Sequence, residues 1–135
     1  MIGKSGFSMD TFRFMLDSNV VIDMLNDDLV FSSFLADFPN CEVFINPVVA
    51  IEVLAKAGMG KDEEAAARAL LDSFVWTEID KAVCEIAVQI RRAKELRLPD
   101  ALIAASAIAL NATVLSNDSH LRDYQRSGYT ARATR

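Results

Sequence analysis

Residues 98–110 (LPDALIAASAIAL) form a stretch of almost entirely apolar residues with high helix propensity. Pro99 suits the first turn of a helix, where its missing N–H costs no hydrogen bond, and an acid in that turn complements the helix dipole. A helix that is apolar on almost every face must be covered by other elements. The fold therefore needs further layers around this helix, and its single acid, Asp100, lies where the chain enters the interior.

Short apolar strands and amphipathic helices alternate along the rest of the chain. We predict strands at residues 12–16, 41–45, 75–79 and 112–116 with an edge strand near Tyr129, and helices at 20–25, 29–38, 47–57, 62–74, 80–95 and 98–110. Strands that are apolar on both faces are typical of a parallel sheet covered by helices on both sides. The sequence therefore predicts an α/β domain, although the number of helices after each strand is irregular.

The composition is that of one globular domain. A chain of 135 residues, 52% of them hydrophobic, is too short for two domains and too apolar to be disordered. The apolar run 101–110 is shorter than the ~20 residues that a membrane span needs. We expect residues 12–135 to form the domain and the polar residues 1–11 to be an N-terminal extension. Without an apolar leader and with two cysteines outside any metal-binding spacing, Cys41 and Cys84, we expect a cytoplasmic protein with reduced core thiols.

The charge is unevenly distributed. The formal net charge is −5, but residues 1–90 carry −9 and residues 91–135 carry +4. A globally acidic protein is a poor general binder of nucleic acid. The basic last third leaves room for a polyanion on one face, or for an acidic protein partner.

Acidic side chains follow the predicted strands or lie among apolar residues. Asp17 comes directly after the first strand and Asp118 two residues after the strand that ends at Ser116, while Asp100 begins a helix. Glu52 lies within an apolar helix, where an unpaired acid is costly. Ligand sites of open parallel sheets form outside the carboxyl ends of the strands, so these acids are candidates for one site.

Carboxylates that converge in this way would repel one another, and some would stay protonated at neutral pH. A hard divalent cation removes the conflict, because Mg²⁺ and Mn²⁺ prefer oxygen ligands. Such a site positions water and stabilises the charge of a phosphodiester under attack. The pattern therefore favours a metal-dependent reaction that needs no histidine.

Four segments carry a family resemblance. Residues 16–23 (LDSNVVID), 46–54 (NPVVAIEVL), 98–107 (LPDALIAASA) and 116–118 (SND) resemble, in order and spacing, the motifs of PIN-domain ribonucleases, and within them the VapC-type toxins of toxin–antitoxin pairs. The similarity spans residues 12–124, and the third segment is the most specific. It implies a three-layer α/β/α fold with a central, mainly parallel sheet.

The resemblance also implies metal-dependent endonucleolytic cleavage of RNA, in which a metal-activated water attacks phosphorus and the 3′-oxygen leaves. The acids that match the family's catalytic and metal-binding quartet are Asp17, Glu52, Asp100 and Asp118, and the small polar residues beside them, expected around the metal or the substrate, are Ser18, Asn19, Ser116 and Asn117. The expected cofactor is Mg²⁺ or Mn²⁺. Expected partners are RNA, a VapB-like antitoxin that covers the site, and a second copy in a homodimer.

The chain departs from the family after Asp118. Relatives often have a further acid and then Phe there, whereas this chain has Ser119, His120 and Leu121, which leaves one metal or two as open alternatives. A PIN-like scaffold that binds RNA or protein without chemistry is therefore the alternative function. A phosphotransfer receiver or phosphatase is a third, weaker candidate function, because Glu52 within a helix and the segment around Asp100 argue against it.

Each candidate also has a plain structural interpretation. Asp17, with Ser18 and Asn19, can cap a helix, Asp100 can complement a helix dipole, and Asp118 can be a turn residue. Glu52 can pair with Lys56 at the favourable four-residue spacing. We expect His120 and Asp23 on the surface, and Trp76 in the core or an interface. The cations Arg91, Arg92, Lys94 and Arg97 form either a solvated helix face or a surface that holds phosphates or the acidic groups of an antitoxin.

Overall fold

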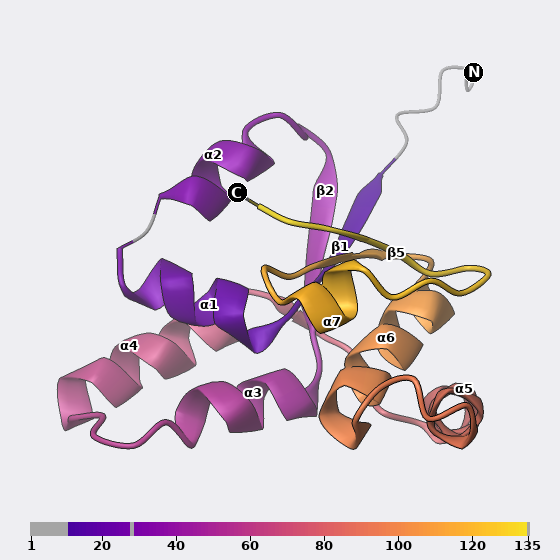
Figure 1. Ribbon diagram of the computed structural model, residues 1–135. Coiled ribbons are helices and arrows are strands. Elements are labelled where there is room, and N and C mark those ends of the chain that lie inside the picture. Colours follow the sequence, from indigo (N-terminus) through magenta and orange to yellow (C-terminus); the bar gives the residue numbers. More distant parts are fainter. Residues whose placement is uncertain (1–10, 28, 135) are drawn as a thin grey trace.

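The computed structural model describes residues 11–27 and 29–134. Their five strands form one parallel sheet in the order β3-β2-β1-β4-β5. The strands are β1 (Phe12–Leu16), β2 (Cys41–Ile45), β3 (Val75–Trp76), β4 (Thr113–Leu115) and β5 (Thr130–Arg132). Figure 1 shows β1 and β2 side by side near the middle of the molecule.

Helices fill the connections between these strands. They are α1 (Ser18–Leu25), α2 (Val30–Leu35), α3 (Pro47–Leu54), α4 (Lys61–Asp72), α5 (Lys81–Arg92), α6 (Leu98–Leu110) and α7 (Ser119–Arg122). Several begin at the residues that the sequence indicates. The side chain of Asn46 accepts a hydrogen bond from the amide of Val49 at the start of α3, and that of Asp80 accepts one from Val83 at the start of α5.

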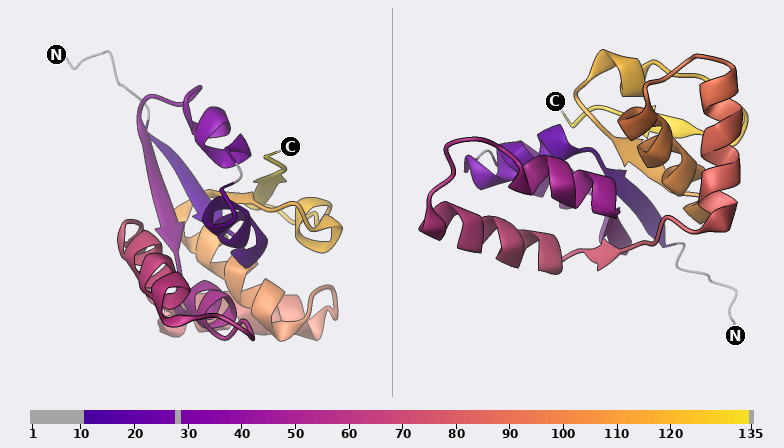
Figure 2. Two further views of the ribbon diagram at one scale, coloured as in Figure 1. Left: turned by 90° about the vertical axis from the view of Figure 1, so that its left-hand side faces the viewer. Right: turned by 90° about the horizontal axis from the view of Figure 1, so that it is seen from below.

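The helices lie on both faces of the sheet, as β1 shows most directly. The ring of Phe14 contacts Phe34 of α2, at 5.6 Å between centroids, and Phe38 after it, at 5.1 Å. The neighbouring side chain, Arg13, donates to the backbone oxygen of Leu110 at the end of α6. Because successive side chains of a strand point to opposite faces, α2 and α6 cover opposite sides of β1. The fold is thus the expected three-layer α/β/α sandwich, seen from two further directions in Figure 2.

Helix α6 is buried along most of its length, as its sequence predicts. Its fully enclosed residues are Ala101, Ile103, Ala104, Ala105, Ser106 and Ala107. Ser106 is polar inside this core because Asn46, which is also fully buried, donates to its hydroxyl at 3.0 Å. This bond joins the beginning of α3 to the middle of α6.

Several details differ from the sequence predictions. Helix α2 ends at Leu35 instead of residue 38, and α5 ends at Arg92 instead of residue 95. Strand β3 contains only Val75 and Trp76. Trp76 is 47% exposed on this edge strand, so of the two predicted places, core or interface, only an interface stays a prediction. Helix α3 ends at Leu54 instead of residue 57. The short helix α7 was not foreseen, because Asp118 and its neighbours read as a turn. Cys84 is exposed and Cys41 half-buried, so the prediction of core thiols was wrong, although both are free.

The proposed boundary of the domain falls at the edge of the described chain. The expected extension, residues 1–11, lies outside the described residues except for Thr11, and so does Arg135 at the other end of the expected domain. Within residues 11–27 and 29–134, no helix is long and apolar enough to cross a membrane.

Candidate active site at the carboxyl ends of β1 and β4

The strand order reverses between β1 and β4. From β1 the chain adds β2 and β3 on one side and then β4 and β5 on the other. Such a switch point creates a crevice outside the carboxyl ends of the two central strands. Leu16 pairs with Leu115 in register, and the amide of Asp17 donates to the oxygen of Leu115 at 3.0 Å. The residues that follow β1 and β4 therefore lie side by side.

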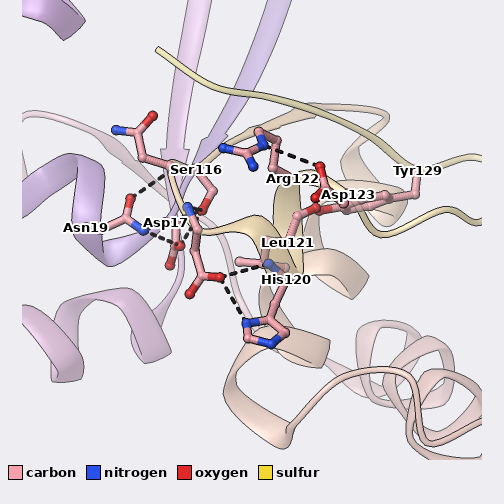
Figure 3. Close-up of polar contacts among 10 residues, drawn as sticks. Asp17, Asn19, Ser116, His120, Leu121, Arg122, Asp123 and Tyr129 are labelled. Atoms are coloured by element: carbon pink, nitrogen blue, oxygen red, sulfur yellow. Dashed lines mark hydrogen bonds and ion pairs between the residues drawn. The ribbon is translucent and has the colours of Figure 1, made fainter. Parts of the chain in front are cut away.

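Asp17 is buried in this crevice and its carboxylate is held on both oxygens. Oδ1 accepts from the amide of Ser18 at 2.7 Å, which caps α1. Oδ2 accepts from the hydroxyl of Ser116 at 2.7 Å and from the Asn19 amide group at 3.1 Å. Figure 3 shows Asn19 and Ser116 on either side of the Asp17 carboxylate. Asp17 does cap the helix, but partners from β4 also fix it in place.

Ser116 and Asn117 extend this network along the end of β4. The hydroxyl of Ser116 accepts from the amide of Asp118 at 3.0 Å, and the amide of Asn117 donates to Oδ1 of Asn19 at 3.3 Å. The side chain of Asn117 bonds in two directions to Thr134, with Nδ2 on Oγ1 at 3.2 Å and the Thr134 amide on Oδ1 at 3.1 Å. The chain beyond β5 is thereby fastened to the crevice.

Asp100 lies in the first turn of α6, half-buried. Burial raises the pKa of its carboxyl above the ordinary value, and the charge of Asp118 raises it further. The Arg97 guanidinium opposes both effects, and His120 does so more weakly. Asp100 and Asp118, from α6 and the end of β4, therefore lie within electrostatic range of each other.

Asp118 caps α7 and contacts the neighbouring histidine. Its Oδ1 accepts from the amide of His120 at 2.8 Å and lies 3.1 Å from the ring atom Nδ1 (Figure 3). These bonds, the amide bond first, lower the pKa of the Asp118 carboxyl despite some burial. His120 is exposed, as expected, but its ring faces an acid of the candidate site.

Glu52 is placed differently from the other three acids. Its side chain is exposed, because the face of α3 that carries Ile51 and Glu52 points to solvent rather than into apolar surroundings. Among the described residues, Glu52 forms no ion pair with Lys56, so the plain pairing is not made. Its charge nevertheless acts on Asp17, so the two carboxylates lie within electrostatic range of each other.

The electrostatics of Asp17 join the candidates. Burial is the main cause of the raised pKa of its carboxyl, and the charges of Asp100 and Glu52 add to it. The hydrogen bonds from Ser116 and Ser18 act in the opposite direction. Asp17 therefore lies within range of Glu52 and Asp100, and Asp100 within range of Asp118.

The chemistry of this donor set fits a divalent cation better than any other ligand. Carboxylate oxygens are the ligands that Mg²⁺ and Mn²⁺ prefer. A bound cation would relieve the repulsion that adds to the effect of burial on the pKa values of Asp17 and Asp100. In the part of the chain that the structure describes, however, no three Asp, Glu, His or Cys side chains are close enough together to hold an ion as they stand. The acids would have to come closer together for one ion to contact all four of them.

A pocket of about 380 Å³ opens beside Asp100 and Asp118. Its lining residues are Glu95, Leu96, Arg97, Asp100, Asp118 and His120. It is therefore acidic where it meets the candidate site and carries a guanidinium and an imidazole on its other walls.

Two of these features could not be taken from the sequence. Thr134 comes 17 residues after Asn117, and no local pattern indicates that they meet. Arg97 belongs to a run of cations that can equally be a solvated helix face, and only the fold shows that it shares a pocket with two acids. For His120 a signal existed, because an Asp two residues before an amide commonly accepts from it.

Comparison with known proteins supports the fold. Among solved structures, the chain is similar to a toxin–antitoxin complex from Klebsiella pneumoniae, with a TM-score of 0.72 and 23% identity over 86% of this chain and 94% of that one. It is also similar to DNA-bound VapBC from Salmonella typhimurium, with a TM-score of 0.73 and 19% identity over 91% and 98%. VapBC2 from Rickettsia felis, bound to a promoter DNA fragment, gives 0.70 and 19% over 90% and 98%.

A search of curated protein sequences gives no match. The family model of the PIN domain, by contrast, matches residues 14–127, which include the last three residues of β1, all of β4 and all four candidate acids. This range covers most of the chain and excludes only its two ends. The protein belongs to the PIN-domain family.

Proposed function

We propose that this protein is a metal-dependent endoribonuclease, the toxin of a toxin–antitoxin pair, and that Asp17, Glu52, Asp100 and Asp118 are its catalytic and metal-binding residues. Nuclease activity is what PIN domains generally have. The observation that carries the proposal is the buried Asp17 carboxylate, which Ser116 and Asn19 hold at the strand ends within electrostatic range of acids from two other elements. Perturbed carboxyls gathered in a crevice are typical of sites that bind a cation and do chemistry.

The residues around these acids would have distinct roles. Ser116, Asn19 and Ser18 hold the Asp17 carboxylate in one orientation, so its two oxygens are presented at a fixed place. Asn117 orients Asn19 through its backbone amide. Mg²⁺ or Mn²⁺ held by the acids would supply a water of lowered pKa and would neutralise charge that develops at phosphorus.

Cleavage of RNA by the purified protein tests the proposal. We expect total cellular RNA to be cut in Mg²⁺ and left intact in EDTA. Asp17→Asn and Asp100→Asn should each reduce the rate by about 100-fold or more, the scale on which loss of a preorganised charged group acts. Asp72→Asn is a matched control, because Asp72 is an exposed acid at the end of α4. Cleavage that needs no metal, or that survives in Asp17→Asn, would contradict the proposal.

The alternative is a scaffold that binds RNA or protein without chemistry. It is favoured by the bonds from His120 that engage Asp118, and by the separation of the acids among the described residues. Titration calorimetry with Mn²⁺ separates the two functions. A nuclease should bind Mn²⁺ in a way that Asp17→Asn abolishes and Asp72→Asn does not, whereas a scaffold should show no such dependence.

We further propose an antitoxin partner, a homodimer and a cytoplasmic location. Several similar structures are toxin–antitoxin complexes, some of them bound to DNA. Val88 and Leu98 are exposed and line one apolar pocket together with Leu102, and contiguous exposed apolar groups mark protein contacts. Light scattering after size exclusion tests the dimer, and a clean monomer would refute it. Co-expression with a neighbouring small open reading frame tests the antitoxin.

A further inference from the structure

Arg97 has a free guanidinium beside the candidate site. The residue is exposed and lines the same pocket as Asp100, Asp118 and His120. Across residues 11–27 and 29–134 its side chain makes no hydrogen bond, no ion pair within 4.0 Å and no ring contact. Its charge acts on Asp100 and on Asp118 without direct contact with either.

Most other arginines of the described chain are engaged. Arg13 and Arg68 pair with glutamates, and Arg122 pairs with Asp123. Arg91 bonds to the oxygen of Leu96, Arg126 to Gln89, and Arg132 lies over the ring of Phe34 at 4.9 Å. Of the arginines at positions 11–27 and 29–134, only Arg92 and Arg97 have no such partner. Arg92 lies on α5 and lines a different pocket, with Cys84, Val88 and Leu98.

The position of Arg97 is unfavourable for a cation unless an anion is near. It is the N-cap residue of α6, and its side chain makes no capping bond. The positive end of the helix dipole disfavours a cation there. Asp100 and Asp118 offset this cost through their charges, but a divalent metal bound to both acids would cancel those charges and leave the helix dipole unopposed at Arg97. The arginine then needs another anion at the pocket.

We propose that Arg97 binds a phosphate of the RNA backbone next to the phosphate that is cleaved. This inference rests on the proposed function, since it adds a substrate-binding residue to the same site. The pocket is open beside the acids, and a guanidinium binds phosphate oxygens through two parallel hydrogen bonds. Because Arg97 is exposed while Asp100 is half-buried, its phosphate lies on the outer side of the acids. It strengthens binding of substrate and transition state equally.

Binding and kinetics of one set of variants test this. In an Asp17→Asn background with Mg²⁺, anisotropy of a fluorescein-labelled, mixed-sequence single-stranded RNA should show about 10-fold weaker binding for Arg97→Gln. The slope of log affinity against log salt should fall by about 0.7, the value for one lost phosphate contact on a single strand. Arg97→Lys should restore part of the loss. In the active protein, Arg97→Gln should raise KM and leave kcat nearly unchanged.

Arg92→Gln is the matched control, because it removes the same charge from an equally free arginine outside the pocket. Equal effects of Arg92→Gln and Arg97→Gln would overturn the inference, since they would indicate only the general field of the protein. A fall in kcat with unchanged KM would also overturn it. Mn²⁺ affinity must not fall in Arg97→Gln, because removal of a nearby cation cannot weaken cation binding; a fall would indicate damage to the site.

The two proposals fail separately in these experiments. If the wild-type protein cleaves no RNA with any divalent metal, the proposed function is wrong. If the wild-type protein cleaves RNA and Arg97→Gln matches it in KM, in RNA affinity and in salt slope, only the role of Arg97 is wrong.

Discussion

At the scale of single residues, the hydroxyl of Ser116 links two acids of the candidate site. It donates to Oδ2 of Asp17 and accepts from the backbone amide of Asp118. The first bond is the strongest influence that lowers the pKa of the Asp17 carboxyl against the effect of burial. Ser116 therefore sets how readily Asp17 ionises, and it does so from a buried position at the end of β4.

Ser116→Ala should raise the pKa of Asp17 further, because burial would then act with less opposition. When the folded-state pKa of an acid lies above its unfolded-state value, here 3.8, the protein becomes less stable as the pH rises between these two values. The free energy of unfolding in urea should thus fall by about 1–2 kcal/mol at pH 7. The loss of unfolding free energy should be smaller below pH 3.8, where Asp17 is protonated in both states. Part of the loss should remain there, because the Asp118 amide has lost its hydrogen-bond acceptor.

Ser33→Ala is the control for this measurement, since Ser33 is exposed on α2. It should change the free energy of unfolding by less than about 0.5 kcal/mol at either pH. A Ser116→Ala deficit that is equal at both pH values would show that the hydroxyl does not act through the charge of Asp17.

At the scale of elements, α6 is held in register by a polar pair inside the core. Asn46 both caps α3, through its oxygen, and donates to Ser106 of α6 through its nitrogen. Both side chains are fully buried, where a polar group left unpaired is costly. The pair therefore fixes how α3, which carries Glu52, is placed relative to α6, which carries Asp100.

Ser106→Ala should lower the free energy of unfolding by about 1–3 kcal/mol, because it leaves the Asn46 nitrogen with only a long bond to the Leu102 oxygen. Asn46→Ala should cost more, since the cap of α3 is lost as well. In a double-mutant cycle by urea denaturation, the two changes should couple by at least about 0.5 kcal/mol. Additive effects would show that the bond contributes nothing.

The elements also show which helices and strands can be predicted from the sequence and which cannot. Strong signals located α3, α5 and α6: Asn before Pro, Asp80 as a cap, and a fully apolar helix with Pro at its first turn. The prediction was wrong at β3. The apolar residues there indicate a buried strand over 75–79, but only Val75 and Trp76 pair with β2, at the edge of the sheet. Order along the chain indicated which acids lie at strand ends. It could not show that Asp118 bonds His120 or that Glu52 faces solvent, because side-chain direction depends on tertiary packing.

At the scale of the whole molecule, the candidate acids come from distant parts of the chain. Asp17 follows β1, Glu52 lies on α3, Asp100 on α6 and Asp118 after β4, and only the folded state brings their charges into range. A ligand that needs several of them binds the folded state alone. Such binding stabilises the fold by an amount set by ligand concentration and affinity.

Mn²⁺ should therefore raise the melting temperature of the wild-type protein, in line with a stabilisation of about 2.7 kcal/mol at a concentration 100 times the dissociation constant. Differential scanning fluorimetry measures this shift directly. Asp72→Asn should keep the shift and Asp100→Asn should lose most of it. The same shift in both variants would place the bound ion elsewhere on this acidic protein.

The hydrogen bonds between Thr134 and Asn117 have a practical consequence for the expression of this protein. Thr134 bonds Asn117 beside the Asp17 network, and Arg132 lies over Phe34 of α2, so residues 132–134 pack next to the candidate site. An affinity tag fused at the carboxyl end, or a stop codon a few positions early, acts directly on the candidate site.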